Sequence, residues 1–468
     1  MRLAHAASRL LLPLILAAAP PLSAAPARAS TGGAKMITAG TSGDYRTIGD
    51  ALAAAADGDT VLVLPGVYRE HLEITRAVVL LGRPGAVLDG GGEGTVLTLR
   101  APAVVSGLRV RGSGSNLSRE DAGIMVLAAD GVRIEGNELE DVLFGIYLKE
   151  SADPQVRDNV IRGKALPVAQ RGDGIRLWYC RGGRVEGNRL WRVRDLVIWF
   201  TRELTVTGNE VSDSRYGLHY MYSDHNHFTN NRFLRNRVGA FVMYSKDIEL
   251  RDNVFAEAAG ASGIGLGLKD TDGVRAEGNV FVASATGISL DNSPSTLGSK
   301  NVFRNNVVAW NDVGIHLLPA VAGNQFEENR VSGNLTPVAV SGGGDALANE
   351  WSGNYWSEYA GLDEDGDGIG DTPFVHARLA DDLFVRHVEL RLFELSPAVA
   401  TLDILGEAFP LLKPRPVVVD PRPLSRPPGP EGRGSGPGAD VLLATAWLGA
   451  GVAAALVLAR LRGVRSWP

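Results

Sequence analysis

Apolar and polar residues alternate with a period of two in short segments, and these segments recur about every 22 residues along most of the chain. In each repeat apolar residues stand one and three positions after a glycine such as Gly123 or Gly145, and a second apolar pair flanks an asparagine 14 residues after that glycine. The asparagines stand at positions 137, 159, 188, 209, 231, 253, 279, 306, 329 and 354. Alternation predicts strands with one buried face, and repetition at this period predicts a solenoid.

The repeats are too short to hold a helix each, so we predict an all-β chain folded as a right-handed parallel β-helix over residues 36–360, with coils ~4.8 Å apart. A leucine-rich-repeat horseshoe is disfavoured because no Leu-x-x-Leu-x-Leu frame with a following helix is present. Residues Thr47–Ala56 are predicted to form a short helix that caps the first coil, and Thr60–Tyr68 to form a strand. We interpret the asparagines as structural, because asparagine at a bend tolerates left-handed geometry and can hydrogen-bond to its neighbours above and below.

Both ends of the chain carry apolar segments. Residues 1–29 are typical of a secretory signal peptide, with Arg2 and Arg9 before an apolar run and Ala27-Arg28-Ala29 as a cleavage site; a site after Ser23 is the alternative. Val441–Ala459 contains no charge and three arginines follow it, which predicts a transmembrane helix with a cytoplasmic C-terminus. A hydrophobic helix that docks on the protein is the alternative. Residues 361–412 are predicted to form an acidic loop and a helical cap, and 413–438 a Pro/Gly linker.

Composition narrows the function. The formal net charge is −6, which argues against a nucleic-acid surface. The single cysteine, Cys180, excludes an intrachain disulfide and a zinc site built from several thiolates. Cys180 aligns with Thr201, Ser223 and Ser245, so we expect it to be a small buried side chain. The folded part is predicted to lie in the periplasm, attached to the cytoplasmic membrane.

One outward face of the solenoid is unusual. If the first and third residues after the glycine point inward, the second and fourth must point outward. Across four coils these outward positions form an apolar and aromatic stripe, with further aromatic residues where the strand ends, and such a stripe indicates a contact surface. Its members are Trp178, Trp199, Met221, Met243, His219, Phe241, Tyr222 and Tyr244.

The stretch GLHYMYSDHNHF (217–228) holds three of the eight histidines and one of the five methionines. His219 and Met221 share a face with Met243 of the next coil, and thioether and imidazole ligands suit copper(I). His225 and His227 belong to the turn before the next strand. A copper site at His219, Met221 and Met243 and a protein-docking patch without metal both remain open, since methionine and aromatic residues are also favoured at adaptable interfaces.

A secreted carbohydrate-active enzyme, such as a polyuronate lyase, hydrolase or epimerase, is the alternative function. That chemistry needs carboxylates on adjacent outward positions. Asp291 is nearly alone in the outward columns, and we interpret Asp173 and Asp195 as ordinary turn residues. A non-catalytic protein is therefore favoured.

An acidic loop follows the last repeat. Asp363, Asp365, Asp367 and Asp371 have the spacing of positions one, three, five and nine of a calcium loop. Phe374 stands where the glutamate of position twelve is expected, which leaves Asp381 or Asp382 as replacements. A structural calcium ion and a solvated acidic turn are the two interpretations.

These features together resemble the NosD family of periplasmic maturation proteins of nitrous oxide reductase. The resemblance covers nearly the whole mature chain and rests on the Asp57–Tyr68 entry, the Leu88–Gly92 turn, the Gly/Asn repeats, the Gly217–Tyr222 segment and the closing motif from Gly353 to Pro373. It implies a non-catalytic protein that partners an ABC-type transporter, with permease and ATPase subunits, and helps to assemble the copper–sulfur centre of the reductase. A copper chaperone lipoprotein and the apo-reductase are the implied clients.

Overall fold

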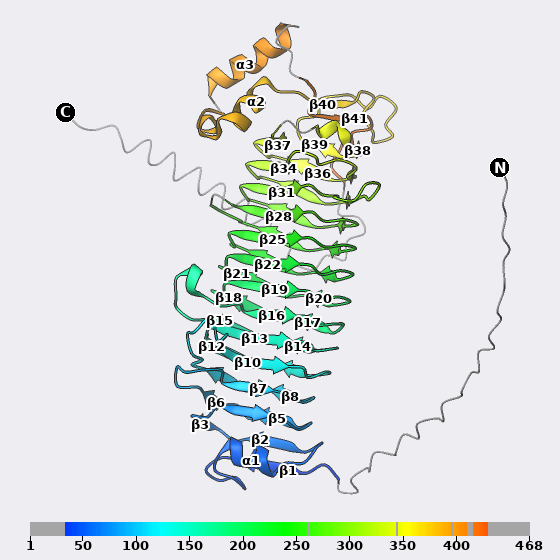
Figure 1. Ribbon diagram of the computed structural model, residues 1–468. Coiled ribbons are helices and arrows are strands. Elements are labelled where there is room, and N and C mark those ends of the chain that lie inside the picture. Colours follow the sequence, from blue (N-terminus) through cyan, green and yellow to red (C-terminus); the bar gives the residue numbers. More distant parts are fainter. Residues whose placement is uncertain (1–32, 261, 343–344, 395, 410–414, 429–468) are drawn as a thin grey trace, which may run out of the picture. The chain divides into compact units, whose positions relative to one another are not determined.

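The computed structural model describes residues 33–428, apart from 261, 343–344, 395 and 410–414 (Figure 1). The predicted signal peptide and transmembrane segment lie outside the described residues. None of the helices in the described part of the chain is long and apolar enough to span a bilayer.

The chain winds as a parallel β-helix of about 14 turns, as the repeats predicted (Figure 1). Each full turn contributes one strand to each of three sheets, which we call A, B and C, and every strand pairs in parallel with the strand one turn away. The predicted strand Thr60–Tyr68 is two strands, because the chain turns from sheet A into sheet B at Leu64 and Pro65.

Sheet A has 14 strands. They are β1 (Met36–Ala39), β2 (Thr60–Val63), β5 (Val79–Gly82), β8 (Val104–Ser106), β11 (Arg133–Glu135), β14 (Gln155–Arg157), β17 (Arg184–Glu186), β20 (Thr205–Thr207), β23 (His227–Thr229), β26 (Glu249–Arg251), β29 (Arg275–Glu277), β32 (Val302–Arg304), β35 (Gln325–Glu327) and β38 (Glu350–Ser352).

Sheet B has 13 strands. They are β3 (Gly66–Tyr68), β6 (Ala86–Asp89), β9 (Arg109–Arg111), β12 (Glu138–Val142), β15 (Val160–Gly163), β18 (Arg189–Trp191), β21 (Glu210–Ser212), β24 (Arg232–Leu234), β27 (Val254–Ala256), β30 (Val280–Val282), β33 (Val307–Ala309), β36 (Arg330–Ser332) and β39 (Tyr355–Trp356).

Sheet C has 12 strands and carries the candidate site. They are β4 (Leu72–Ile74), β7 (Leu97–Leu99), β10 (Ala122–Leu127), β13 (Phe144–Lys149), β16 (Ile175–Trp178), β19 (Asp195–Trp199), β22 (Tyr216–Met221), β25 (Val238–Met243), β28 (Ile264–Lys269), β31 (Thr286–Asp291), β34 (Val313–Leu317) and β37 (Thr336–Val340).

The repeated asparagines form a continuous buried ladder at the corner between sheets A and B. The Oδ1 atom of Asn188, for example, accepts hydrogen bonds from the backbone N–H and the Nδ2 of Asn159, both at 3.0 Å, while Asn159 Nδ2 also donates to the carbonyl of Ile134. This pattern runs from Asn137 to Asn354 and confirms the structural interpretation. The left-handed backbone belongs to the residue before each asparagine, such as Asp158 with φ 52°, and not to the asparagine itself. That position explains why Gly, Asp or Asn usually precedes it.

Inward residues fill the cylinder with stacked apolar and aromatic side chains. Phe233, Phe255 and Phe281 stack at 5.2 and 5.0 Å between ring centres, and all three are fully buried. The amino-terminal end of this core is covered by the predicted cap helix, α1 (Ile48–Ala54), whose N-cap Thr47 accepts a hydrogen bond from the N–H of Asp50. Ile48 and Ala51 of α1 are buried, so the cap shields the end of the core from water.

The carboxyl-terminal end is closed by the cap that follows β39. It contains β40 (Phe374–His376), α2 (Leu379–Arg386), η3 (Val388–Phe393), α3 (Pro397–Ala408) and β41 (Val418–Asp420), while two single 3₁₀ turns, η1 (Val168–Gln170) and η2 (Ala346–Ala348), lie in loops of the solenoid. Part of the range predicted as linker is thus folded: β41 pairs antiparallel with β40, and Leu424 bridges to Tyr355 and Ile369. Pro and Gly residues alone do not reveal a short strand whose partner is distant in the sequence.

Asp420, at the end of β41, terminates the asparagine ladder. Its Oδ2 accepts from the backbone N–H and the Nδ2 of Asn354 and from Trp356 Nε1, at 3.0, 2.9 and 3.1 Å. The carboxylate therefore satisfies the donors that the last asparagine would otherwise leave unpaired.

A buried ion pair in the cap is expected to make its stability depend on pH. Although burial lowers the pKa of His376, hydrogen bonds to Asp381 (2.6 Å) and Glu358 (3.4 Å) outweigh that cost and raise its pKa to about 9. Because the folded pKa is raised above the ordinary value, this stabilisation, roughly 3 kcal/mol, is complete below about pH 6.5 and is lost as the pH rises through 9. Urea unfolding at pH 6 and pH 9.5 should show this loss in the wild type, whereas His376→Gln should lack it; equal pH dependence in both proteins contradicts the assignment.

Candidate functional site

The predicted stripe does point outward, on the exposed face of sheet C. In β16, β19, β22 and β25 the inward residues, such as Leu177 and Tyr220, have no measurable exposure. Six of the outward residues are half-buried and form what we call the aromatic face: Trp178, Trp199, His219, Met221, Phe241 and Met243. Trp199 and Met243 therefore lie on the surface of the solenoid and not in its core.

A second row of aromatic side chains, the aromatic ladder, borders this face where the strands end. Tyr179, Phe200, Tyr222 and Tyr244 all have left-handed backbones with φ between 50° and 53°. Their rings stack nearly parallel at 4.6, 5.2 and 5.1 Å between centres. The three tyrosines are 54%, 48% and 39% exposed. The same corner is left-handed in neighbouring coils, at Ala128, Glu150, Asp270 and Asn292, so this conformation belongs to the fold. These four coils differ from the others in their row of stacked aromatic rings, which is typical of a contact surface.

Strand register places the candidate copper ligands at neighbouring outward positions. Met221 pairs with Met243 on one side and with Trp199 on the other, and His219 pairs with Val197 and Phe241. His219 and Met221 are two residues apart on β22, so their side chains leave the same face. The register thus places the three candidate ligands at neighbouring outward positions, and Tyr222 and Tyr244 of the ladder lie beside them.

The side chain of His219 is oriented by the buried carboxylate of Asp195. Its Nδ1 contacts Asp195 Oδ2 at 3.2 Å, and Asp195 also accepts from Arg215 Nε at 3.0 Å and from the backbone N–H of Tyr216 at 3.1 Å. Asp195 is fully buried. A carboxylate on one imidazole nitrogen is the usual support of a metal-binding histidine, because it leaves Nε2 for the ligand.

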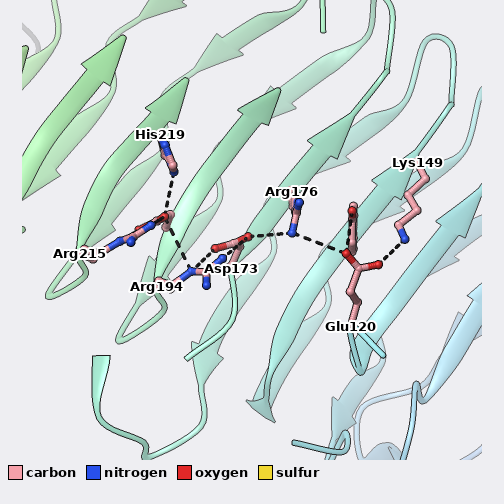
Figure 2. A network of polar contacts seen from close by, with 9 residues as sticks. Glu120, Lys149, Asp173, Arg176, Arg194, Arg215 and His219 are labelled. Carbon is pink, nitrogen blue, oxygen red and sulfur yellow. Dashed lines mark hydrogen bonds and ion pairs between the residues drawn. The ribbon is translucent and has the colours of Figure 1, made fainter. Parts of the chain in front are cut away.

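The same carboxylate belongs to a polar network that crosses five successive coils (Figure 2). Arg194 bridges Asp195 and Asp173, at 3.9 and 3.0 Å; Arg176 bridges Asp173 and Glu120, at 3.6 and 3.8 Å; and Glu120 also pairs with Lys149. The prediction that Asp173 and Asp195 are ordinary turn residues was therefore wrong. Asp195 stands at the position where most other repeats have a glycine. This departure from the repeat was the one signal in the sequence that pointed to a special role for Asp195.

Burial and pairing with cations shift the pKa values of Asp173 and Asp195 in opposite directions. Burial would raise the pKa of Asp195, but hydrogen bonds from His219 and Arg215 outweigh it and hold this pKa below its ordinary value. Burial raises the pKa of Asp173, and the nearby charge of Asp195 adds to the rise although Arg194 opposes it. The carboxylate beside His219 thus stays ionised.

Arg176 ties the network to the aromatic face. Its guanidinium carbon lies 4.8 Å from the ring of Tyr147, 5.1 Å from Trp178 and 4.9 Å from Trp199. These distances are within cation–π range, so the charged residues also position the two indoles.

The other two histidines of the 217–228 stretch and the single cysteine lie apart from the site. His225 and His227 are mostly exposed on the sheet A side, where they contact Asp247 and Glu249 at 3.5 and 2.9 Å. Cys180 is buried, as predicted, and burial raises the pKa of its thiol to about 11. A thiol with a raised pKa is a poor metal ligand at neutral pH.

The carboxylates on this face are paired with cations in the described structure. Asp291 contacts Lys269 at 2.6 Å, and Asp173 and Asp195 are enclosed beside their arginines. General acid–base chemistry on a polysaccharide needs carboxyl groups within reach of the glycosidic bond. The geometry therefore gives no support to the enzyme alternative.

In the acidic loop, carboxylate oxygens of Asp363, Asp365 and Asp367 lie within 4.8 Å of one another. Asp371 does not join this group, since its Oδ2 accepts from the N–H of Glu364 at 2.7 Å. Asp381 is committed to His376 in the cap, so it does not replace the missing twelfth ligand. Three of the four predicted oxygen donors are thus assembled.

Comparison with known proteins identifies the class of protein to which the chain is similar. The family model described as periplasmic copper-binding protein (NosD) matches residues 157–361, which include the whole aromatic face. A probable ABC transporter binding protein NosD from Pseudomonas aeruginosa is 34% identical over 418 residues, covering 78% of this chain and 88% of the relative. Its namesake from Stutzerimonas stutzeri is 32% identical, covering 76% and 85%.

The chain belongs to the NosD family. Its curated relatives are named as binding proteins and not as enzymes, in agreement with the non-catalytic prediction, and the family description supports a periplasmic location. Among solved structures, the A-module of the mannuronan C-5 epimerase AlgE6 from Azotobacter vinelandii is similar, with a TM-score of 0.52 and 18% identity over 65% of this chain and 92% of that module. This likeness concerns the fold alone.

Proposed function

We propose that this protein is a membrane-attached periplasmic accessory of an ABC-type transporter, with permease and ATPase subunits, and acts in assembling the copper–sulfur centre of nitrous oxide reductase. The aromatic face and the aromatic ladder dock a copper chaperone lipoprotein and the apo-reductase. The observation that carries this proposal is an exposed face with two thioethers, an imidazole held by Asp195 and a bordering row of stacked aromatic rings, in a chain from a copper-binding family. Such a surface is suited to partners that carry copper.

In this proposal copper is the cargo that passes between the partners. His219 supplies Nε2, and Met221 and Met243 supply thioethers, a soft set that favours copper(I). The site lies on the surface, where the ion can pass between proteins without opening the solenoid. Docking supplies the remaining ligands or excludes water from the ion.

We also propose that calcium binds Asp363, Asp365 and Asp367. The ion would stabilise the loop against Ser425, whose hydroxyl donates to Asp363 at 2.7 Å, and so hold the chain that leads toward the membrane segment. Oxygen-rich acidic loops of this spacing suit calcium.

One purification tests the function and both metals. The tagged full-length protein, isolated from detergent-solubilised membranes of a cell that expresses the reductase system, should retain permease and ATPase subunits, and its soluble domain should bind one copper(I) and one calcium.

Tyr222→Ser with Tyr244→Ser should reduce recovery of the chaperone and the apo-reductase, because the exposed ladder is lost. Val67→Ser, at an apolar residue 57% exposed on β3, is the matched control. Recovery of neither transporter subunits nor clients contradicts the proposal, and Asp365→Asn with unchanged calcium uptake contradicts the calcium site.

A further inference from the structure

The space around the proposed copper ligands is bounded differently on its two sides. Val197, Trp199, His219 and Met221 form a square of outward positions on β19 and β22, and Phe241 and Met243 extend it on β25. Phe241 leans toward the next strand, since a Cβ on Gly267 would lie 2.5 Å from its Cδ2 atom. The ring thus covers Gly267 on β28.

On the other side stands Trp199. Its ring centre lies 5.0 Å from that of His219, with an interplanar angle of 86°, and its backbone pairs with that of Met221. The small Val197 next to it leaves room for the indole to reach His219. Trp199 therefore contacts one candidate ligand and neighbours a second.

Ring packing, and not a hydrogen bond, holds the indole of Trp199 in place. Nε1 of Trp199 is inaccessible and has no hydrogen-bond partner among the described residues. The ring instead packs on Trp178, 5.5 Å away, and on the guanidinium of Arg176. Arg176 and Trp178 come from the coil before Trp199, whereas His219 and Met221 come from the coil after it. Charges on Glu120 and Asp173 compensate Arg176.

An ion on Nε2 of His219 lies ~3 Å from the imidazole centre. Because Met221 pairs with Trp199 on β19 and with Met243 on β25, an ion shared by His219 and Met221 has Trp199 on one side and Met243 on the other. The ion is then within the ~6 Å over which an aromatic face attracts a cation. Copper(I) is soft and carries a single charge, so a π face and thioethers suit it, whereas copper(II) prefers nitrogen and oxygen in tetragonal geometry.

We propose that Trp199 is a fourth contact of the bound copper(I), through its indole face, and that this contact helps the site to select copper(I) over copper(II). The inference rests on the proposed copper site at His219, Met221 and Met243. It assigns to Trp199 a role in metal binding beyond the docking of clients.

Copper(I) titration of the soluble domain without oxygen, in competition with a chromophoric copper(I) chelator, tests the contact. Trp199→Leu should lower copper(I) affinity about 3- to 30-fold, and Trp199→Phe, which keeps a ring, should lower it less. Trp191→Leu, at a half-buried outward indole on β18 of sheet B, is the matched control and should bind as the wild type does. Copper(I) should also change tryptophan fluorescence and near-ultraviolet absorption in the wild type and in Trp191→Leu, but not in Trp199→Leu.

The outcomes separate this inference from the copper site itself. Wild-type affinity and an unchanged spectral response in folded Trp199→Leu overturn the contact and leave the three-ligand site standing. Equal losses in Trp199→Leu and Trp191→Leu also overturn it, because they indicate a general disturbance of the solenoid. No copper(I) uptake by the wild type overturns the site and the contact together. Should Trp199→Leu fail to fold, Trp199→Phe with an unaltered spectral response overturns the contact.

Discussion

Replacing Met221 and Met243 together with serine is expected to lower copper(I) affinity by at least ~100-fold, because hard hydroxyl oxygens replace two of the three soft donors. Both side chains are outward and half-buried, so the fold should persist, and the thermal midpoint should change little. The same chelator competition measures the affinity, and circular dichroism monitors the fold. Met36→Ser, at a methionine 63% exposed on β1, is the matched control.

The double variant also tests the link between copper and the client. If the aromatic face loads the reductase, activation of nitrous oxide reductase in cells should fall together with copper(I) affinity. Unchanged activation in a variant that has lost copper(I) binding would exclude this site from maturation. Loss of activation with intact copper(I) binding would instead assign the two methionines to docking.

Replacing Asp420 with alanine is expected to release the carboxyl-terminal cap. The change leaves the backbone N–H of Asn354, one of the two Nδ2 hydrogens of Asn354 and the Nε1 of Trp356 without an acceptor, at positions that are almost completely buried. The other Nδ2 hydrogen still donates to the carbonyl of Phe326. Each such donor costs about 1–3 kcal/mol, so the cap and the last coil should lose about 4 kcal/mol. In a solenoid each coil contacts only its neighbours, so the loss should stay near that end.

Amide hydrogen exchange measures this local release, and urea unfolding followed by tryptophan fluorescence measures its effect on Trp356. Exchange should accelerate in β38, β39 and β41, whereas the coils around β19 should keep their protection. Asp420→Asn retains one acceptor oxygen and should have an intermediate effect. Wild-type protection of β39 in the alanine variant would show that Asp420 does not close the ladder.

Much of the fold could be predicted because the residue pattern within each repeat determines the local structure of that repeat. The asparagines at Asn137 to Asn354 and the inward residues flanking them recur at fixed offsets, and one buried face per strand determines which side chains point outward. The orientation of Trp199, Met221 and Met243 followed from that parity alone. The prediction of Thr60–Tyr68 as one strand failed because a corner at Leu64 and Pro65 does not interrupt the apolar run.

The site was only partly predictable, because its supporting residues are distant in sequence and fall where the repeat is irregular. Asp195 stands in a column of glycines and looked like a turn residue; the structure shows that Arg215 and His219 from the next coil enclose it. Glu120 and Arg176, 56 positions apart in the sequence, meet only because two coils bring them together. No periodic pattern marks such pairs.

The sequence by itself determined the solenoid, its buried and exposed faces and the row of thioether, imidazole and aromatic side chains, because parity along a strand and a constant repeat decide which way each residue points. Only the tertiary structure decided that a buried carboxylate orients His219, that Arg176 joins the aromatic face to a charged network, and that Asp420 returns to close the asparagine ladder. These contacts depend on the distance between coils and on the path of irregular segments, which strand periodicity leaves open.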